Sequence, residues 1–207
     1  MGKLNPGIKA LIDRDEDLAR AFKTAGVPAS RKRPPGFASL LRIIINQQVS
    51  VAAGRAIWGS VESGLKTVTP KAVLAVSDTD LRGFGLSRSK AVYAQELAGA
   101  IAGGSLDLDG LKRLDDGAAM QQLTRIKGIG RWTAEIYLMF ALGRPDIWPA
   151  GDLALAVAVE RLLSLAERPK PKTLDGIAER WRPWRSSASV LLWNFYNHAG
   201  PLEAAKK

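Results

Sequence analysis

Residues 123–135 of the chain read LTRIKGIGRWTAE, and this segment is the most informative part of the sequence. Its pattern predicts a helix that ends near Ile126, a Gly-Ile-Gly hairpin, and a second helix that begins at about Arg131. Gly128 and Gly130 let the backbone turn sharply and lie close to a phosphate, while the N–H groups that open the second helix supply donors and a positive dipole end. Ile129 is expected to hold the two helices together.

This arrangement is typical of a helix-hairpin-helix clamp, which holds one DNA strand by its phosphates without reading the bases. An ordinary two-helix turn with a glycine C-cap is the alternative.

The charge of the chain is a separate observation: 30 Lys and Arg against 20 Asp and Glu give a formal net charge of +10. Such an excess most often indicates a polyanionic partner, of which nucleic acid is the commonest, although ribosomal and membrane-surface roles stay open.

Composition excludes several kinds of chemistry. The sequence contains no cysteine, which excludes disulfides, thiolate zinc sites, cysteine nucleophiles and cysteine-ligated iron–sulfur clusters. His198 is the only histidine, so a Ser-His-Asp triad or a multi-histidine metal site is not expected. The N-terminus lacks the apolar region of a signal peptide, and no apolar stretch approaches the roughly 18 residues that span a bilayer. We therefore expect a cytoplasmic protein without a membrane partner.

Nearly every apolar run has helical spacing, so the sequence predicts an all-α fold of about ten helices. The N-terminal run forms one apolar face from Ile8, Leu11, Ile12, Leu18 and Phe22. Further helices are expected at 51–63, from 70, and at 88–102, 115–125, 131–142, 152–166, 173–181 and 184–198. Their expected N-caps include Ser50, Thr69 and Ser87. The basic, proline-rich segments 31–36 and 168–172 are interpreted mainly as solvated linkers.

Asp152 stands in the segment WPAGDLAL, residues 148–155, after the hairpin. A Pro-X-Gly turn brings its carboxylate to the start of an apolar helix. The usual role of Asp at such a position is that of an N-cap. Taken alone, this residue does not decide between capping and chemistry.

The sequence resembles the helix-hairpin-helix/Gly-Pro-Asp superfamily of base-excision DNA glycosylases in three respects: the hairpin, the Asp at position 152 and the spacing between them. GIGRWTA at 128–134 and WRPWRS at 181–186 are similar to its alkylpurine branch, the 3-methyladenine DNA glycosylase II type, over roughly residues 36–198. The resemblance implies two helical subdomains with the active-site cleft between them: 36–143, which ends in the hairpin segment 123–135, and 1–35 with 144–207. A chain of 207 residues has no room for the N-terminal β-domain of some relatives, so the compact form is expected.

The resemblance implies a DNA repair enzyme that flips an alkylated purine out of the duplex and hydrolyses its N-glycosidic bond. The catalytic aspartate of the family falls on Asp152, which would stabilise the developing oxocarbenium ion and position or deprotonate water. Because an N-alkylated purine is already cationic, it can leave without a strong acid, and one carboxylate suffices. Glu135 is the nearest competitor, but a solvated or dipole-stabilised charge is expected there.

Base-pocket positions of the family fall on Trp132, Trp193 and Ile136. An indole face near a cationic base is worth roughly 0.5–2 kcal/mol, although core packing is the alternative for either tryptophan. Bifunctional relatives carry a lysine at the position of Trp132, so the enzyme is expected to be monofunctional and to leave the strand intact. Trp181 and Trp184 are expected to serve structural packing.

The family's wedge, which fills the gap left by the flipped nucleotide, falls on Gln48 in INQQVS, residues 45–50. Solvated amides that end a helix are the alternative. Further DNA contacts fall on Gly128, Gly130, Arg131 and Thr133. The resemblance also implies a monovalent cation held by the backbone carbonyls of Thr124, Ile126 and Ile129; no cofactor is required, and no iron–sulfur cluster is expected.

The expected partner is double-stranded DNA that contains alkylated bases, bound by a monomer. Two alternatives are a glycosylase for a deaminated or mismatched base, and a helix-hairpin-helix module that binds DNA without catalysis. Asp152 and the two pocket tryptophans favour an enzyme, since a pure clamp needs none of them.

Overall fold

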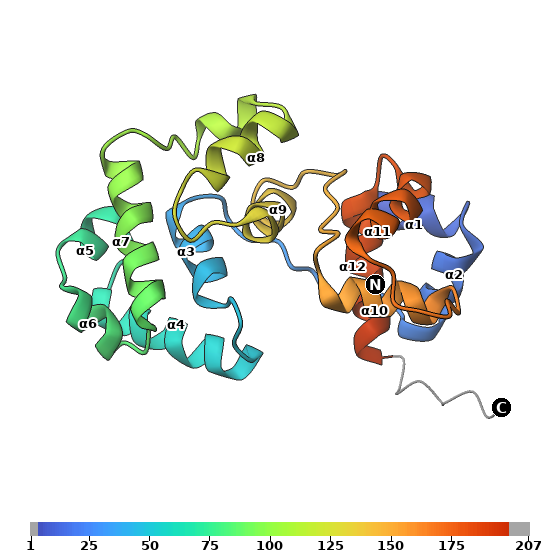
Figure 1. Cartoon of the computed structure of the whole chain (residues 1–207), viewed down its shortest axis with the longest axis horizontal. Coiled ribbons are helices and arrows are strands. Elements are labelled where there is room, and N and C mark those ends of the chain that lie inside the picture. Colours follow the sequence, from blue (N-terminus) through green and yellow to red (C-terminus); the bar gives the residue numbers. More distant parts are fainter. Residues whose placement is uncertain (1–3, 199–207) are drawn as a thin grey trace. The chain divides into compact units, whose positions relative to one another are not determined.

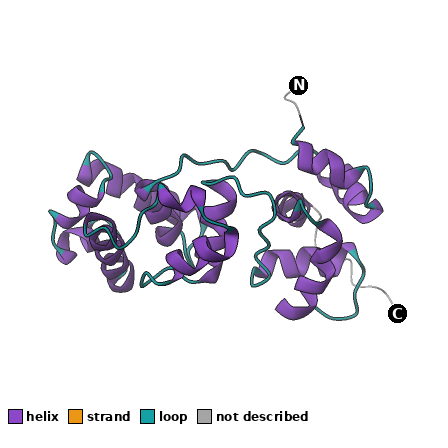
Figure 2. Cartoon of the chain, turned by 90° about the horizontal axis from the view of Figure 1, so that it is seen from above, coloured by secondary structure: helices purple, strands orange, loops and turns teal. Residues whose placement is uncertain are grey.

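The computed structural model describes residues 4–198. In that range the chain folds into helices joined by loops and turns, without a strand (Figures 1 and 2). The expected all-α class is therefore confirmed. No helix in this part of the chain combines the length and apolarity needed to cross a bilayer. Contacts divide the chain into two compact units, residues 32–143 and residues 1–31 with 144–207.

The unit of residues 32–143 is built around α3 (Phe37–Ile45), whose residues 43–45 are at most 3% exposed. Helix α3 packs against α4 (Val51–Leu65), α7 (Arg88–Ala102) and α9 (Arg131–Phe140). The other helices of the unit are α5 (Pro70–Leu74), α6 (Asp78–Gly83), the 3-10 helix η1 (Gly110–Arg113) and α8 (Asp116–Thr124). Helices α5 and α6 contact α7, and α8 contacts α9. The hairpin between α8 and α9 is thus carried by a helix that packs directly on the core.

Side-chain caps set several helix starts in this unit. Ser50, Thr69 and Ser87 each accept a hydrogen bond from the backbone N–H three residues later, which confirms the expected caps. Apolar periodicity does not predict α6, because six residues are too few to establish a 3.6-residue repeat. Ser77 and Asp80 form a capping box that starts this short helix.

The other unit joins helices from the two ends of the described chain. Helices α1 (Pro6–Ile12) and α2 (Glu16–Ala25) pack with α12 (Arg185–His198), which also contacts α10 (Leu153–Leu162). Figure 1 shows these helices together in blue, orange and red. Helix α11 (Pro171–Ala178) and the 3-10 helix η2 (Glu179–Trp181) complete the unit. Trp181 is fully buried, and Trp184 lies close to Gly7, so both tryptophans take part in packing.

The N-terminal apolar run forms two helices, where its spacing predicts one continuous face. Asp15 caps α2, because its Oδ1 accepts the Leu18 N–H at 2.9 Å. Its Oδ2 accepts the indole N–H of Trp181 at 2.9 Å and lies 2.8 Å from Nε of Arg180. One carboxylate therefore separates α1 from α2 and anchors α2 to a buried tryptophan.

The boundary between the units follows residue 31, four residues before the boundary expected from the sequence. The Arg33 N–H donates to the Phe140 carbonyl, and the Gly36 N–H donates to the Tyr137 hydroxyl, both at 2.9 Å. These bonds fasten the proline-rich segment to α9. The segment is thus bonded to α9 at Arg33 and Gly36, while its other residues stay exposed as the sequence suggests.

Replacement of Asp15 tests the anchor of α2. Asp15→Ala should lower the free energy of unfolding by about 2–4 kcal/mol, because a cap is worth about 1 kcal/mol and a buried donor left without an acceptor costs about 1–3 kcal/mol. Asp15→Asn, which keeps one acceptor oxygen for the Leu18 N–H but not the second one for the Trp181 indole, should keep the cap and lose the anchor. Urea unfolding measures both, with Asp13→Ala at the exposed Lys9 pair as the control, expected within about 0.5 kcal/mol of the wild type.

Candidate active site and nucleic-acid interface

Asp152 is the N-cap of α10, and its carboxylate also meets α12. Oδ1 accepts the backbone N–H of Leu155 and the indole N–H of Trp193, each at 3.0 Å. Hydrogen bonds to an ionised acceptor are stronger than neutral ones, so these two donors fix the orientation of the carboxylate. Capping and chemistry are compatible here, because the capping bond orients the group to which the family pattern assigns catalysis.

Arg31 lies over the ring of Trp193, with its guanidinium carbon 5.3 Å from the ring centroid. Burial lowers the pKa of the Arg31 guanidinium, and the charge of Asp152 opposes that shift. Arg31 therefore stacks on the indole while it keeps an exposed surface. Arg31 thus covers one face of the Trp193 indole, and the indole N–H orients Asp152. The role of Trp193 as a base-pocket wall stays a prediction.

The start of α12 anchors the segment that leads into α10. Arg185 donates from Nε and Nη2 to the two carboxylate oxygens of Asp146 at 2.9 and 3.0 Å. The Ser186 hydroxyl donates to the Arg144 carbonyl at 2.7 Å and accepts the Ile147 N–H at 3.0 Å. The WRPWRS segment thus fixes residues 144–147, just before the turn that delivers the candidate catalytic carboxylate.

The hairpin between α8 and α9 requires glycine at position 128. Its φ is +91°, a left-handed conformation that favours glycine. A Cβ atom at Gly128 would also collide with the ring of Tyr93 on α7. Ile129 is buried, as expected of a residue that holds the two helices together.

Gly130 is under no such constraint from the chain. It is the N-cap of α9, with φ −80° and no side-chain hydrogen bond that caps the helix. A Cβ atom there would meet nothing within 4 Å among the atoms tested in the described residues. A phosphate held close to this helix N-terminus would supply the missing reason for a glycine.

Gln48, the expected wedge, is exposed in the loop between α3 and α4 and has φ +53°. The neighbouring Gln47 donates from Nε2 to the Gly128 carbonyl at 3.0 Å and to the Thr133 hydroxyl at 2.8 Å. Thr133 is only 3% exposed and its hydroxyl accepts the Gln47 bond, while its contact with DNA stays a prediction.

Helix α9 carries the remaining residues that the sequence assigned to the site. Trp132 is half-buried and Ile136 is buried, and their role as base-pocket walls stays a prediction. Glu135 is 2% exposed, where a solvated charge was expected. The carboxylate tolerates burial because Nε of Arg131, one turn earlier, donates to it at 2.8 Å. Arg131 itself keeps 68% of its side chain exposed, at the surface where DNA contact was expected.

The predicted cation site involves the carbonyl of Thr124, the last residue of α8, and two carbonyls that follow it. The Ile126 carbonyl accepts the Ile129 N–H at 3.0 Å, and a carbonyl oxygen has a second lone pair. These oxygens suit a hard cation, and the site at Thr124, Ile126 and Ile129 stays a prediction. In residues 4–198, no three His, Cys, Asp or Glu side chains gather as metal ligands.

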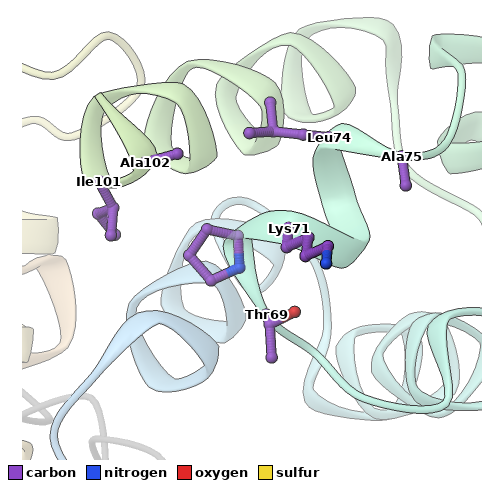
Figure 3. A pocket seen from close by; sticks show the side chains of 7 residues that line it. Thr69, Lys71, Leu74, Ala75, Ile101 and Ala102 are labelled. Carbon is purple, nitrogen blue, oxygen red and sulfur yellow. The ribbon is translucent and has the colours of Figure 1, made fainter. Parts of the chain in front are cut away.

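A groove between α5 and the end of α7 has none of these residues in its lining (Figure 3). Leu74, Ile101 and Ala102 give it an apolar lining, and Lys71 is the one titratable residue in that lining. One ammonium group provides no catalytic pair, so we assign no chemistry to this groove.

Three residues in these clusters escape prediction from the sequence. Arg31 lies in a run of basic residues that looks solvated. Lys90, whose Nζ donates to the Ile45 and Gln47 carbonyls beside Gln48, lies in the first turn of a helix whose start is set by Ser87. Gln47 does carry a signal, because consecutive amides directly after an apolar run are unusual. That signal marks the loop but does not say which amide faces the hairpin.

Comparison with known proteins defines the class. The family profile described as HhH-GPD superfamily base excision DNA repair protein matches residues 41–183, and the chain belongs to this family. A relative from Bacillus subtilis, named putative DNA-3-methyladenine glycosylase YfjP, is 31% identical over 162 residues, which are 74% of this chain and 56% of the relative. The match thus spans little more than half of that relative's length.

Two solved structures share the fold. A DNA-3-methyladenine glycosidase from Bacillus halodurans has a TM-score of 0.80 and 32% identity, with coverage of 93% of this chain and 89% of that chain. The 3-methyladenine DNA glycosylase Mag1 from Schizosaccharomyces pombe, in complex with abasic DNA, has a TM-score of 0.81 and 28% identity. The alignment with Mag1 covers 91% of this chain and 95% of that chain.

The two hairpin glycines should differ in their effect on stability. Gly128→Ala should lower the free energy of unfolding by at least about 1–3 kcal/mol, because it forces a left-handed alanine against Tyr93. Gly130→Ala should cost at most about 1 kcal/mol, the difference between residues at an N-cap. Thermal and urea unfolding of the two variants measure this; equal losses would contradict the assignment of the steric constraint to Gly128.

Proposed function

We propose that the protein is a monofunctional DNA glycosylase for alkylated purines of the 3-methyladenine type. It hydrolyses the N-glycosidic bond and leaves an abasic site. The observation that carries the proposal is the Asp152 carboxylate, oriented by the α10 backbone and the Trp193 indole in a chain of the HhH-GPD family. Relatives named DNA-3-methyladenine glycosylase support the choice of substrate.

Asp152 acts by electrostatic stabilisation. As the glycosidic bond breaks, positive charge develops on the sugar, and a preoriented carboxylate stabilises it without further reorganisation. An alkylated purine leaves as a neutral base, so a second, acidic carboxyl group is not required. Trp193 orients the carboxylate, and Trp132 and Trp193 are the candidates for stacking on the base.

The hairpin holds the DNA backbone, and Gln48 fills the gap that the flipped nucleotide leaves in the base stack. Gly128 sets the turn, Gly130 leaves room at the N-terminus of α9, and the net charge of +10 attracts the duplex. The Mag1 structure, which contains abasic DNA, supports duplex DNA as the partner. The cytoplasmic location and the monomeric state stay predictions.

The first test removes the charge of Asp152 and keeps its shape. Asp152→Asn retains an oxygen that can accept the Leu155 and Trp193 N–H groups, so the fold and duplex binding should be unchanged. Excision of a neutral purine such as hypoxanthine, which cannot leave as readily as a cationic base, should fall by at least about 10²-fold. Single-turnover release of the free base measures this.

A matched control separates chemistry from capping. Asp115 caps α8 by accepting the Ala118 N–H at 2.8 Å, and Asp115→Asn should leave the excision rate within about twofold of the wild type. Full activity of Asp152→Asn would contradict the proposed chemistry. Loss of folding together with retained specific activity would show that Asp152 is only a cap.

The product strand should stay intact until it is treated with alkali. Cleavage without alkali would contradict a monofunctional reaction.

The second test concerns Gly130, where the chain tolerates a methyl group. Gly130→Ala should weaken binding to damaged and undamaged duplex by similar factors, because phosphate contacts position the DNA without specifying its sequence. Gly176→Ala in α11, which also meets nothing within 4 Å, should bind like the wild type. Titrations over a range of salt should give a log–log slope of about −0.9 per phosphate neutralised, and an affinity independent of salt would contradict the clamp.

A further inference from the structure

The loop that carries Gln48 has an unusual backbone. It follows directly from α3, whose residues 43–45 are buried, and reaches the start of α4 at Val51 within five residues. Within it, Gln48 is exposed at φ +53°. A left-handed conformation at a residue other than glycine persists only where the surroundings determine it, and such positions gather at functional sites.

Lys90 supplies one of those surroundings. From the first turn of α7, its Nζ donates to the carbonyls of Ile45 and Gln47, both at 2.7 Å. These oxygens lie at the C-terminal end of α3 and just after it, where carbonyls lack intrahelical partners and a cation is favoured. Partial burial lowers the pKa of the Lys90 ammonium, so the group loses water to make these two bonds. The backbone directly before Gln48 is thereby fixed.

Two side chains of the loop add further supports. Gln47 bonds the Gly128 carbonyl and the Thr133 hydroxyl, which connects the loop to the hairpin. Asn46 lies so close to α4 that a Cβ atom at Gly54 would collide with its Oδ1. The residues on the N-terminal side of Gln48 are therefore held by α4, α7 and α9, while Gln48 itself is left at the surface.

We infer that Lys90 is a positioning residue for base extrusion: its ammonium fixes the Ile45 and Gln47 carbonyls, so that Gln48 is held ready to enter the stack in place of the flipped nucleotide. Gln47 connects this loop to the hairpin, so that binding of the phosphate backbone and insertion of Gln48 occur in one fixed register. The inference rests on the proposed glycosylase function. Lys90 touches neither the base nor the sugar in this account, and it acts through Gln48.

The experiment compares one lesion in two contexts. Lys90→Met keeps the aliphatic stem and removes the ammonium group. Its single-turnover excision from a fully paired duplex should fall about tenfold, because the loop no longer presents Gln48 to the gap that extrusion opens. Excision of the same lesion opposite an abasic site, where there is no pairing partner to break, should fall less than about threefold. Gln48→Ala should show the same ratio.

A double variant tests whether the two residues act as one unit. If Lys90 acts through Gln48, then Lys90→Met with Gln48→Ala should excise no more slowly than Gln48→Ala alone. Lys90→Arg, which restores a charged donor, should recover part of the rate on the paired duplex. Lys71→Met, at a lysine of the groove on α5, is the matched control and should behave like the wild type on both substrates.

Other outcomes overturn the inference. Equal losses on the paired and unpaired lesions would show a general structural role, and multiplicative losses in the double variant would show that Lys90 acts independently of Gln48. If Lys90→Met does not fold, Lys90→Gln, which keeps one donor group, takes its place in the same comparison. Fluorescence of 2-aminopurine opposite the lesion, measured in the Asp152→Asn background, reports unstacking without excision. If the wild type unstacks the 2-aminopurine but releases no base, the proposed glycosylase function is contradicted, while the inference that Lys90 positions Gln48 is not.

Discussion

A single carboxylate oxygen, Oδ1 of Asp152, joins the first turn of α10 to the Trp193 indole of α12. The rest of the candidate active site depends on this interaction. The WRPWRS segment anchors residues 144–147, and Arg31 lies on the indole whose N–H orients the carboxylate. A carboxylate with both donors in place meets developing positive charge without first rearranging, which is the property that makes preorganised groups effective in catalysis.

The hairpin shows how different constraints act on two residues of the same type. Gly128 is required by the chain itself, through its left-handed backbone and the ring of Tyr93. At Gly130 a Cβ atom would meet nothing within 4 Å in the described chain, so sterics do not require glycine there. The first glycine is explained by folding, and the close approach of a phosphate to the second is part of the proposed function.

Much of this could be predicted from the sequence, because it depends on local patterns. Helical spacing gave the all-α class, the caps at Ser50, Thr69 and Ser87 gave helix starts, and the Gly-Ile-Gly segment gave the hairpin. What could not be predicted depends on partners distant in the sequence. The spacing of the N-terminal run does not reveal that Asp15 bonds Trp181, and a glutamate in the first turns of a helix looks solvated until Arg131 is seen to pair with Glu135. Arg31 and Lys90 belong to the same class, since each is defined by a ring or carbonyl that no local pattern identifies.

The unit that contains Asp152 is assembled from both ends of the described chain, with α1 and α2 packed on α12, and the unit of residues 32–143 is continuous. During synthesis on the ribosome, α1 and α2 emerge before the unit of residues 32–143, and their packing partner α12 emerges after it. The unit of residues 32–143 can complete its core before α12 is available to α1 and α2, because its contacts join residues that are closer in the sequence. The hairpin can therefore form before Asp152 is in place, and a chain released after residue 143 would carry the hairpin without the residue proposed to act on the glycosidic bond.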